Sequence, residues 1–324
     1  MARLARSSVL TIACLLLCGS LGGPSLAQPP DSVRLTHVGR VTHPPIDEMS
    51  GIVKSPQFDN TWWVHNDSGD KPRLFAIDST GAVHLAPWRR GTYAAGAALD
   101  TTDRPVWPGL HLGAAAHVDY EDIAADDSTL YLADIGNNGN ARRDLGLYVI
   151  REPFYYARRT RPIKHIPIAY PDQETVPAQD WHFDAEALFV DDGTLYLLTK
   201  HRTGQQIDGL EAGTKLYRLD TEHPHRVNTL TLVDRHETIP APTAAALSPS
   251  GNRLAVFGYG SVWIFRRPAE GDQWLSTDPR RIDLPDERLQ QSEAVTWDRA
   301  HKLRITNEQR DVFVLEVGRG GADS

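Results

Sequence analysis

Five stretches of the sequence each begin with a residue that carries a side-chain oxygen, and five positions later each has Ser or Asp. The oxygen-bearing residues are Ser50, Glu121, Glu186, Thr243 and Glu293, and the small residues that follow them are Gly51, Asp122, Ala187, Ala244 and Ala294. Three glutamates held close together repel one another unless they are protonated, solvated or bridged by a cation. Calcium accepts about six to eight oxygen ligands and suits such a set. Zinc and copper suit it less well, because the set has no thiol and no histidine. Alternatively, the glutamates cap backbone amides and hold water.

Each of these residues starts a short alternating segment that turns back into a second one, which predicts a β-hairpin. In the stretch 117–138 the turn is Asp126-Asp127-Ser128. A third strand follows each hairpin, and its aromatic residues are Phe75, Tyr148, Tyr217, Trp263 and Phe313. Fourth strands are predicted near residues 83–88 and at 164–170, 227–234 and 280–286. Four antiparallel strands repeated around an axis make a blade of a β-propeller, so the sequence predicts an all-β propeller.

The number of blades follows from the number of repeats. The fifth unit has three strands, and the unpaired alternating segment 31–43 supplies its fourth, so the N-terminal strand completes the last blade and closes the ring. Five blades are predicted, with six as the fallback if the segment 86–117, which we interpret as an extended loop, contains another. The aromatic residues of the third strands are expected to form the core between blades. No substantial helix is expected.

In a blade, the innermost strand and its neighbour run in opposite directions, so the start of one and the end of the other lie on the same face. This places further polar residues beside the five oxygen ligands. The candidates for a catalytic base are Asp67, Asp134, His65 and His201. The candidates for substrate binding are Lys200, Arg202, Arg142, Arg143, Asn137, Asn138 and Asn307. Each also has an ordinary structural explanation, such as an Asx-turn or a solvated charge.

The first 27 residues have the pattern of a signal peptide: Arg3 and Arg6, an apolar run, and Ser25-Leu26-Ala27 at the cleavage position. We therefore predict export to the periplasm or the medium, with no transmembrane anchor after cleavage. A short linker (28–30), one propeller domain (31–318) and a disordered tail (319–324) follow. Both cysteines lie in the leader, so the mature chain has no disulfide and no catalytic thiol. The net charge of −8 argues against nucleic-acid binding and is compatible with a cation. The mature chain is expected to be a monomer.

Several stretches resemble the soluble calcium-activated nucleotidases, or apyrases: EMSGI at 48–52, NDSG at 66–69, and EDIA at 121–124 leading to LYL at 130–132. The resemblance implies a five-bladed propeller with a central calcium held by one oxygen from each blade, and nucleotide hydrolysis. The chain departs from that family at Thr243, where the family has serine. It more closely resembles secreted bacterial propellers of unassigned function, through YEDIA at 120–124, DIGNN at 134–138, DAEAL at 184–188 and SPSG at 248–251. A distant resemblance to phytase-like propellers is also present.

Two classes of function remain open. One is calcium-dependent hydrolysis of a phosphate ester or anhydride, in which the metal polarises a phosphoryl oxygen, cations neutralise the rest and a carboxylate or histidine directs water. The other is a non-catalytic propeller, stiffened by calcium, that binds a small molecule or an envelope protein on the same face. No Gly-rich phosphate loop, GxSxG or HExxH motif favours an enzyme.

Overall fold

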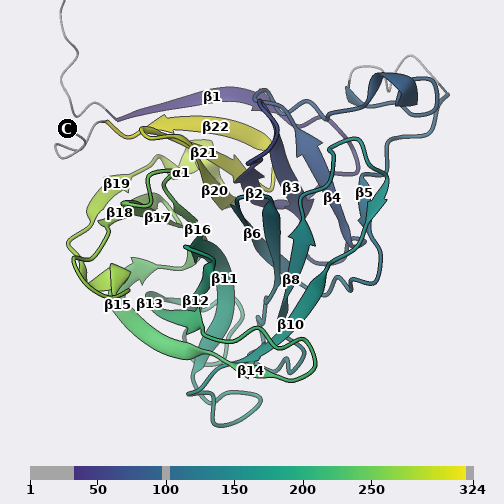
Figure 1. Cartoon of the computed structure of the whole chain (residues 1–324). Coiled ribbons are helices and arrows are strands. Elements are labelled where there is room, and N and C mark those ends of the chain that lie inside the picture. Colours follow the sequence, from purple (N-terminus) through teal and green to yellow (C-terminus); the bar gives the residue numbers. More distant parts are fainter. Residues whose placement is uncertain (1–32, 97–102, 319–324) are drawn as a thin grey trace, which may run out of the picture.

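The five oxygen-bearing stretches form the innermost strands of five sheets around a central axis (Figure 1). The structure is a computed structural model, and it describes residues 33–96 and 103–318. Each inner strand packs against the next, and the last packs against the first. The inner strands are β2 (Met49–Lys54), β6 (Tyr120–Asp126), β11 (Trp181–Asp191), β16 (Pro242–Leu247) and β20 (Ser292–Arg299). The predicted five-bladed propeller is confirmed.

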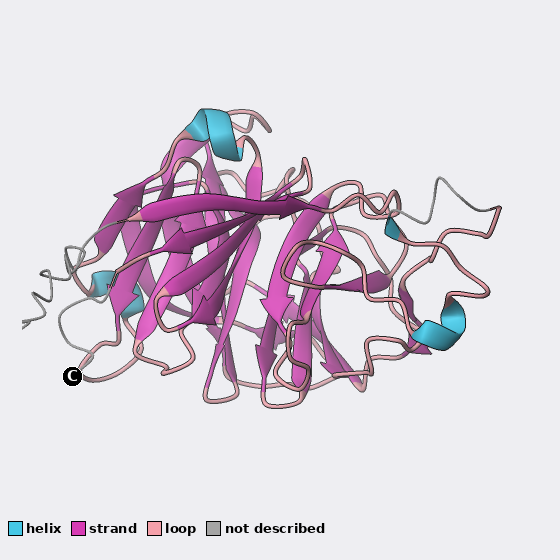
Figure 2. Ribbon diagram, turned by 90° about the horizontal axis from the view of Figure 1, so that it is seen from above, coloured by secondary structure: helices cyan, strands magenta, loops and turns pink. Residues whose placement is uncertain are grey.

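Two further strands continue each blade outward in antiparallel order. The second strands are β3 (Trp62–Asn66), β7 (Thr129–Asp134), β12 (Thr194–Arg202), β17 (Arg253–Gly258) and β21 (Lys302–Asn307). The third strands are β4 (Arg73–Ile77), β8 (Gly146–Arg151), β13 (Leu210–Leu219), β18 (Ser261–Arg266) and β22 (Asp311–Glu316). Seen at right angles to the first view, the strands slope through the molecule and hairpin loops lie at both faces (Figure 2).

The core lies between the blades. Five clusters of buried apolar side chains occupy the five junctions between neighbouring sheets in the described parts of the chain. The third-strand aromatic residues belong to these clusters, as predicted, and all five are buried: Phe75, Tyr148, Tyr217, Trp263 and Phe313. Burial of apolar surface at each junction is therefore what holds one blade against the next.

The N-terminal strand closes the ring. Strand β1 (Arg34–Arg40) pairs with β22 in antiparallel register, from Arg34 opposite Glu316 to Arg40 opposite Asp311. A bulge lies between His37 and Gly39. A Cβ atom at Gly39 would lie 2.0 Å from the carbonyl oxygen of Thr80, so only glycine fits this close approach. The predicted closure by the segment 31–43 is confirmed.

The outer strands overlap the predicted segments in three blades and differ from the prediction in one. The three are β10 (Lys164–Ala169), β15 (Thr231–Pro240) and β19 (Arg280–Asp283). In the third blade the overlap is partial, because the strand runs over Thr231–Pro240 and the prediction was 227–234. In the first blade the fourth strand is β5 (Leu110–Leu112), inside the segment predicted as a loop. The predicted strand near 83–88 is wrong: Val83 makes only an isolated bridge with Ile77, and the 3₁₀-helix η1 (Pro87–Arg89) ends the extended run. Leu110 and Leu112 are almost fully buried, whereas Val83 is only partly buried, so β5 contributes more apolar surface to the core than the segment around Val83 does.

Two short parallel strands extend the sheets at their outer edges. Strand β9 (Arg159–Thr160) pairs with β5, and β14 (Asn228–Thr229) pairs with β10 of the preceding blade. The remaining elements are η3 (Trp274–Ser276) and α1 (Asp286–Leu289). The predicted leader, the linker and the C-terminal tail lie outside the described residues. No helix in the described part of the chain has the length and apolar character needed to cross a bilayer.

Candidate functional site

The starts of the inner strands and the ends of the second strands meet at one end of the channel, around a pocket of about 310 Å³. Four of the five predicted oxygen ligands line it: Ser50, Glu121, Glu186 and Glu293. Other predicted residues in its wall are Asp67, Lys200, Arg202 and Asn138. Tyr259 and Glu308, which follow the ends of second strands as expected for this face, also line it, and Ile207, Asp208, Leu210 and Gln291, which the sequence analysis did not single out, complete the wall. We call this the acidic pocket.

The two hydroxyl residues of the predicted ring connect neighbouring blades. The hydroxyl of Ser50 donates to the carbonyl oxygen of Glu121, at 3.0 Å. Thr243 is almost fully buried, does not line the pocket, and donates its hydroxyl to the carbonyl oxygen of Ser292, at 3.2 Å. Each hydroxyl thus joins its own inner strand to the next one around the axis.

The predicted phosphate-binding cations are paired with carboxylates of the protein. Lys200 Nζ lies 2.7 Å from Glu186 Oε1, and Arg202 Nη2 lies 2.7 Å from Asp184 Oδ2. Both pairs are buried. The Glu186 carboxylate strongly raises the pKa of Lys200, so this lysine stays charged. Charges that neutralise each other inside the fold are less available to an anionic ligand.

Of the other predicted cations and amides, only Asn138 lines the pocket, and most of them contact other parts of the protein. Arg142 Nη2 is 2.9 Å from Asp134 Oδ1, and Arg143 is exposed outside the pocket lining. Asn137 is buried and its Oδ1 atom accepts from the backbone amides of residues 141 and 142. Asn138 accepts a hydrogen bond from Arg202, and Asn307 is buried and donates to the carbonyl oxygen of Leu289. Most of these side chains therefore hold loops in place.

The two predicted histidines do not line the acidic pocket. His65 is fully buried, and Nδ1 lies 2.9 Å from the carbonyl oxygen of Asn66. A Cβ atom at Gly51 would lie 2.0 Å from His65 Nε2, so glycine is needed for the ring to pack there. Burial lowers the pKa of His65 to about 4. The side chain of His201 follows that of Lys200 on β12 and therefore points to the opposite face of the sheet.

Three carboxylates converge where Asp67 and Glu121 line the acidic pocket, with Asp119 beside them, and none of the three is paired with a lysine or arginine among the described residues. One oxygen from each of Asp67, Asp119 and Glu121 lies within 4.8 Å of the others. Gly136 lies directly beside this cluster: a Cβ atom there would be 2.0 Å from Glu121 Oε1 and 2.3 Å from an Asp119 oxygen. Asp119 was missed by the sequence analysis. Its position two residues before Glu121, the spacing at which side chains of an extended chain point the same way, was the available signal.

Burial makes ionisation of these carboxyl groups costly. Burial, reinforced by the charges of Asp67 and Asp184, raises the pKa of Asp119 to about 7. Burial and the neighbouring Glu186 and Asp67 raise the pKa of Glu121 well above its usual range. Burial also raises the pKa of Asp67, and raises that of Glu293 to about 7. A cation in the pocket would reverse this effect by stabilising the ionised forms.

Asp122, next to Glu121, is buried between the inner strands. It occupies the inner-strand position where the other blades have Gly or Ala. Its carboxylate accepts hydrogen bonds from the amides of Ile123 and Leu188, both at 2.8 Å, and from that of Ala245 at 3.3 Å. The side chain thereby joins three blades. The sequence analysis treated Asp122 as one of five small residues, because one sequence cannot show which side chain reaches the axis.

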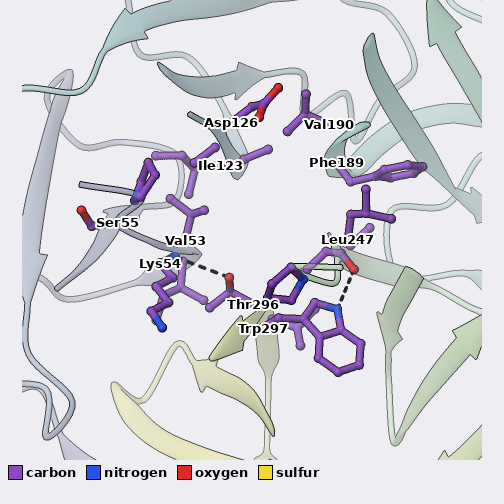
Figure 3. Close-up of a pocket in the computed structure, with 18 of the residues that line it drawn as sticks. Val53, Lys54, Ser55, Ile123, Asp126, Phe189, Val190, Leu247, Thr296 and Trp297 are labelled. Carbon is purple, nitrogen blue, oxygen red and sulfur yellow. Dashed lines mark hydrogen bonds between the residues drawn. The ribbon is translucent and has the colours of Figure 1, made fainter. Parts of the chain in front are cut away.

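A second pocket, of about 350 Å³, opens at the other ends of the inner strands (Figure 3). Its wall is mainly apolar and includes Val53, Ile123, Phe189, Val190 and Leu247 (Figure 3). Trp297 lies at its edge, where the indole Nε1 atom donates to the carbonyl oxygen of Ala246 at 2.9 Å. The two channel mouths therefore differ in chemistry, one acidic and one apolar.

Comparisons with known proteins found only distant structural similarity. No protein-family model and no curated protein matches the chain. Among solved structures, a glucose dehydrogenase matches at 12% identity over 89% of this chain and 100% of its own, with a TM-score of 0.45. The PQQ-bound form of an aldose sugar dehydrogenase from Streptomyces coelicolor matches at 14% identity over 89% and 99%, with a TM-score of 0.44. A luciferin-regenerating enzyme matches at 9% identity over 88% and 81%, with a TM-score of 0.43.

Similarities of this size carry no argument about activity, and the five-bladed fold rests on the sheet topology of the chain itself. The chain is a β-propeller with an acidic pocket at one channel mouth.

Proposed function

We propose that this chain is a calcium-binding β-propeller that binds a ligand at the acidic mouth of its channel. The observation that carries the proposal is the convergence of Asp67, Asp119 and Glu121, whose oxygens lie within 4.8 Å of one another. Carboxylates in this arrangement repel one another, and a hard divalent cation removes the repulsion while supplying the electrostatic stabilisation that burial takes away.

The remaining donors of the acidic pocket suit the same ion. Ser50 adds a hydroxyl from the same blade as Asp67, and Glu186 and Glu293 add carboxylates from two further blades. All are oxygen donors, as calcium prefers, and no thiol or imidazole lines the pocket in the described part of the chain. The proposal keeps four residues of the predicted ring and adds Asp67 and Asp119, whereas Thr243 contributes to the joint between blades instead.

The charge of the acidic pocket favours the binding alternative over phosphate hydrolysis. Six acidic residues line it: Asp67, Glu121, Glu186, Asp208, Glu293 and Glu308. The two basic residues in its wall, Lys200 and Arg202, are both paired with carboxylates. Such a field attracts cations and repels phosphate groups. A neutral or cationic ligand with hydroxyl groups, able to complete the coordination of the ion, fits this chemistry best, and it reaches the protein outside the cytoplasm if the predicted leader exports the chain.

The test is a calcium titration by calorimetry, combined with thermal unfolding in calcium and in a chelator. Wild-type protein should bind calcium and melt at a lower temperature after chelation. Glu121→Gln should weaken calcium binding by about tenfold or more, since it removes a charged ligand. Glu237→Gln, at an exposed position outside the acidic pocket, is the control and should bind like wild type.

The same preparations distinguish binding from hydrolysis. Incubation with a panel of nucleotides and phosphate esters should release no phosphate. Release that disappears in Glu121→Gln would instead support a calcium-dependent phosphohydrolase. An unchanged melting temperature on chelation, with no heat of calcium binding, would remove the metal from the proposal.

A further inference from the structure

A second group of metal-ligating side chains lies on the opposite face of the third blade from Lys200. His182, His201 and Glu211 each offer one ligand atom within 4.8 Å of the others. They come from three adjacent strands, β11, β12 and β13, and are therefore neighbours across one sheet. None of the three lines the acidic pocket.

Two irregularities in the sheet bring these side chains together. Between the pairs Trp181–Arg202 and Asp184–Lys200, strand β11 has one residue more than β12, and this bulge brings His182 beside His201. Between the pairs Leu198–Leu216 and His201–Glu211, strand β13 also has extra residues. Bulges re-aim side chains, and they are common beside functional sites.

Gly213 shows how closely the second bulge is fitted to the histidine. Its φ angle is +130°, in the region that favours glycine, and a Cβ atom there would lie 2.6 Å from His201 Nδ1. A side chain at this position would therefore displace the imidazole. The local backbone is shaped to accommodate His201 next to Glu211.

The contacts within the group leave one buried ring nitrogen without a hydrogen-bond partner among the described residues. His182 Nε2 lies 2.5 Å from Glu211 Oε1, and Thr203 donates its hydroxyl to Glu211 Oε2 at 3.0 Å. The rings of His182 and His201 stack with centroids 3.9 Å apart. His201 Nε2 is buried and has no hydrogen-bond partner among the described residues. A buried polar atom without a partner costs free energy unless something outside the protein satisfies it.

We propose that His182, His201 and Glu211 form a binding site for a transition-metal ion, with zinc as the best fit. Two imidazoles and one carboxylate are a ligand set that zinc accepts, with the fourth position left to water or to a ligand. Thr203 holds the carboxylate as an outer partner, in the way that metal-ligating carboxylates are commonly supported. The site is separate from the oxygen-only acidic pocket, so the chain has one site for a hard cation and one for a borderline cation.

Two features of the group bear on binding. Parallel rings cannot both direct an in-plane lone pair at one ion, so metal binding requires one imidazole to rotate, and His182 is the less buried of the two. The nearby Lys215 is already paired with Asp172, 2.8 Å away.

The experiment is a zinc titration of the tag-free protein in excess calcium, which keeps the acidic pocket saturated. One zinc ion per chain should bind with a dissociation constant of about 1 μM or tighter, as expected for a site with three protein ligands. His201→Gln and Glu211→Gln should each weaken zinc binding by about tenfold or more. His225→Gln, at an exposed histidine outside the group, is the matched control and should bind like wild type.

A spectroscopic measurement on the wild-type protein keeps the proposal testable if a variant fails to fold. Cobalt substituted for zinc should give the intense visible absorption of a four-coordinate site, and zinc should shift the ring-nitrogen resonances of His182 and His201. Zinc binding that is absent from the wild type, that is unchanged in a folded His201→Gln variant, or that leaves those resonances in place would overturn the proposal.

Discussion

Asp122 shows how one side chain can determine the centre of a propeller. It occupies a position where the other four inner strands have Gly or Ala, and it satisfies amides of its own blade and of two others. Burial raises the pKa of Asp122 well above its usual range, and the three amide hydrogen bonds oppose that effect. The residue makes the axis a joint between blades, which apolar contacts alone would not specify.

We expect Asp122→Ala to be among the most destabilising single substitutions in the chain. It leaves the amides of Leu188 and Ala245 buried without their acceptor, which should lower the free energy of unfolding by about 3 kcal/mol or more. Asp122→Asn keeps an acceptor oxygen of similar shape and should cost less. Chemical denaturation of the three proteins measures the difference, and an alanine variant as stable as wild type would contradict this role.

Contacts of single side chains also explain how the acidic pocket differs from the ring of ligands that the sequence predicted. The spacing of Ser50, Glu121, Glu186 and Glu293 along the chain correctly predicted a shared pocket, because inner strands all start on one face. The spacing could not show that Lys200 extends back to Glu186, or that Thr243 bonds sideways to Ser292. Those contacts depend on the direction in which each side chain points between blades. The spacing of residues in one sequence does not reveal that direction.

At the scale of elements, strand β1 closes the ring of blades. It completes the last sheet by covering the outer edge of β22, and Leu35 packs against the core cluster between the fourth and fifth blades. An uncovered strand edge presents unpaired backbone groups that can pair with another molecule. Strand β1 therefore both stabilises the ring and prevents the edge of β22 from pairing with another molecule.

A protein that begins at Val41, and so lacks β1, should melt at a lower temperature and self-associate. The matched control begins at Asp31 and keeps the strand. Thermal unfolding and analytical ultracentrifugation measure the two effects. If the shorter protein melted like the control and sedimented as the same species, β22 would not need its partner.

Strand predictions succeeded where the repeat was complete and failed where a loop was long. The inner, second and third strands share one pattern in all five blades, so each copy supports the others. The fourth strand of the first blade, Leu110–Leu112, is three residues long and lies far from the third strand in sequence. A closer segment that included Val83 looked more regular. Packing of Leu110 and Leu112 into the core decided between them, and packing is not visible in a local pattern.

For the whole molecule, the positions of the charged groups affect stability more than the net charge does. The full chain carries a net charge of −8, and six acidic residues line a single pocket. Burial raises the pKa of Asp119 and Glu293 to about 7 and that of Glu121 well above its usual range. At about pH 6, these carboxyl groups therefore keep their protons in the folded protein without metal, whereas in the unfolded chain they have already released them.

This difference predicts an unusual pH dependence. A carboxyl group whose pKa is raised by folding contributes stability below its unfolded pKa, and that contribution is lost as the pH rises through the folded pKa. In chelator, the melting temperature should fall as the pH rises from about 5 through about 7, the window that the raised pKa values of Asp119 and Glu293 define. Calcium should offset the loss, so the gap between the two melting curves should widen with pH. A gap of constant size would show that the carboxyls do not govern calcium binding.

The antiparallel pairing of β1 with β22 has one more consequence. Because Arg34 lies opposite Glu316, the first and last strands of the ring begin and finish at the same spot on its outer rim. A short peptide could bridge that spot, and the ring could be reopened at a hairpin loop elsewhere, giving a circularly permuted chain with the same five sheets. A lipid, surface or fusion partner attached at that spot would leave both channel mouths unobstructed.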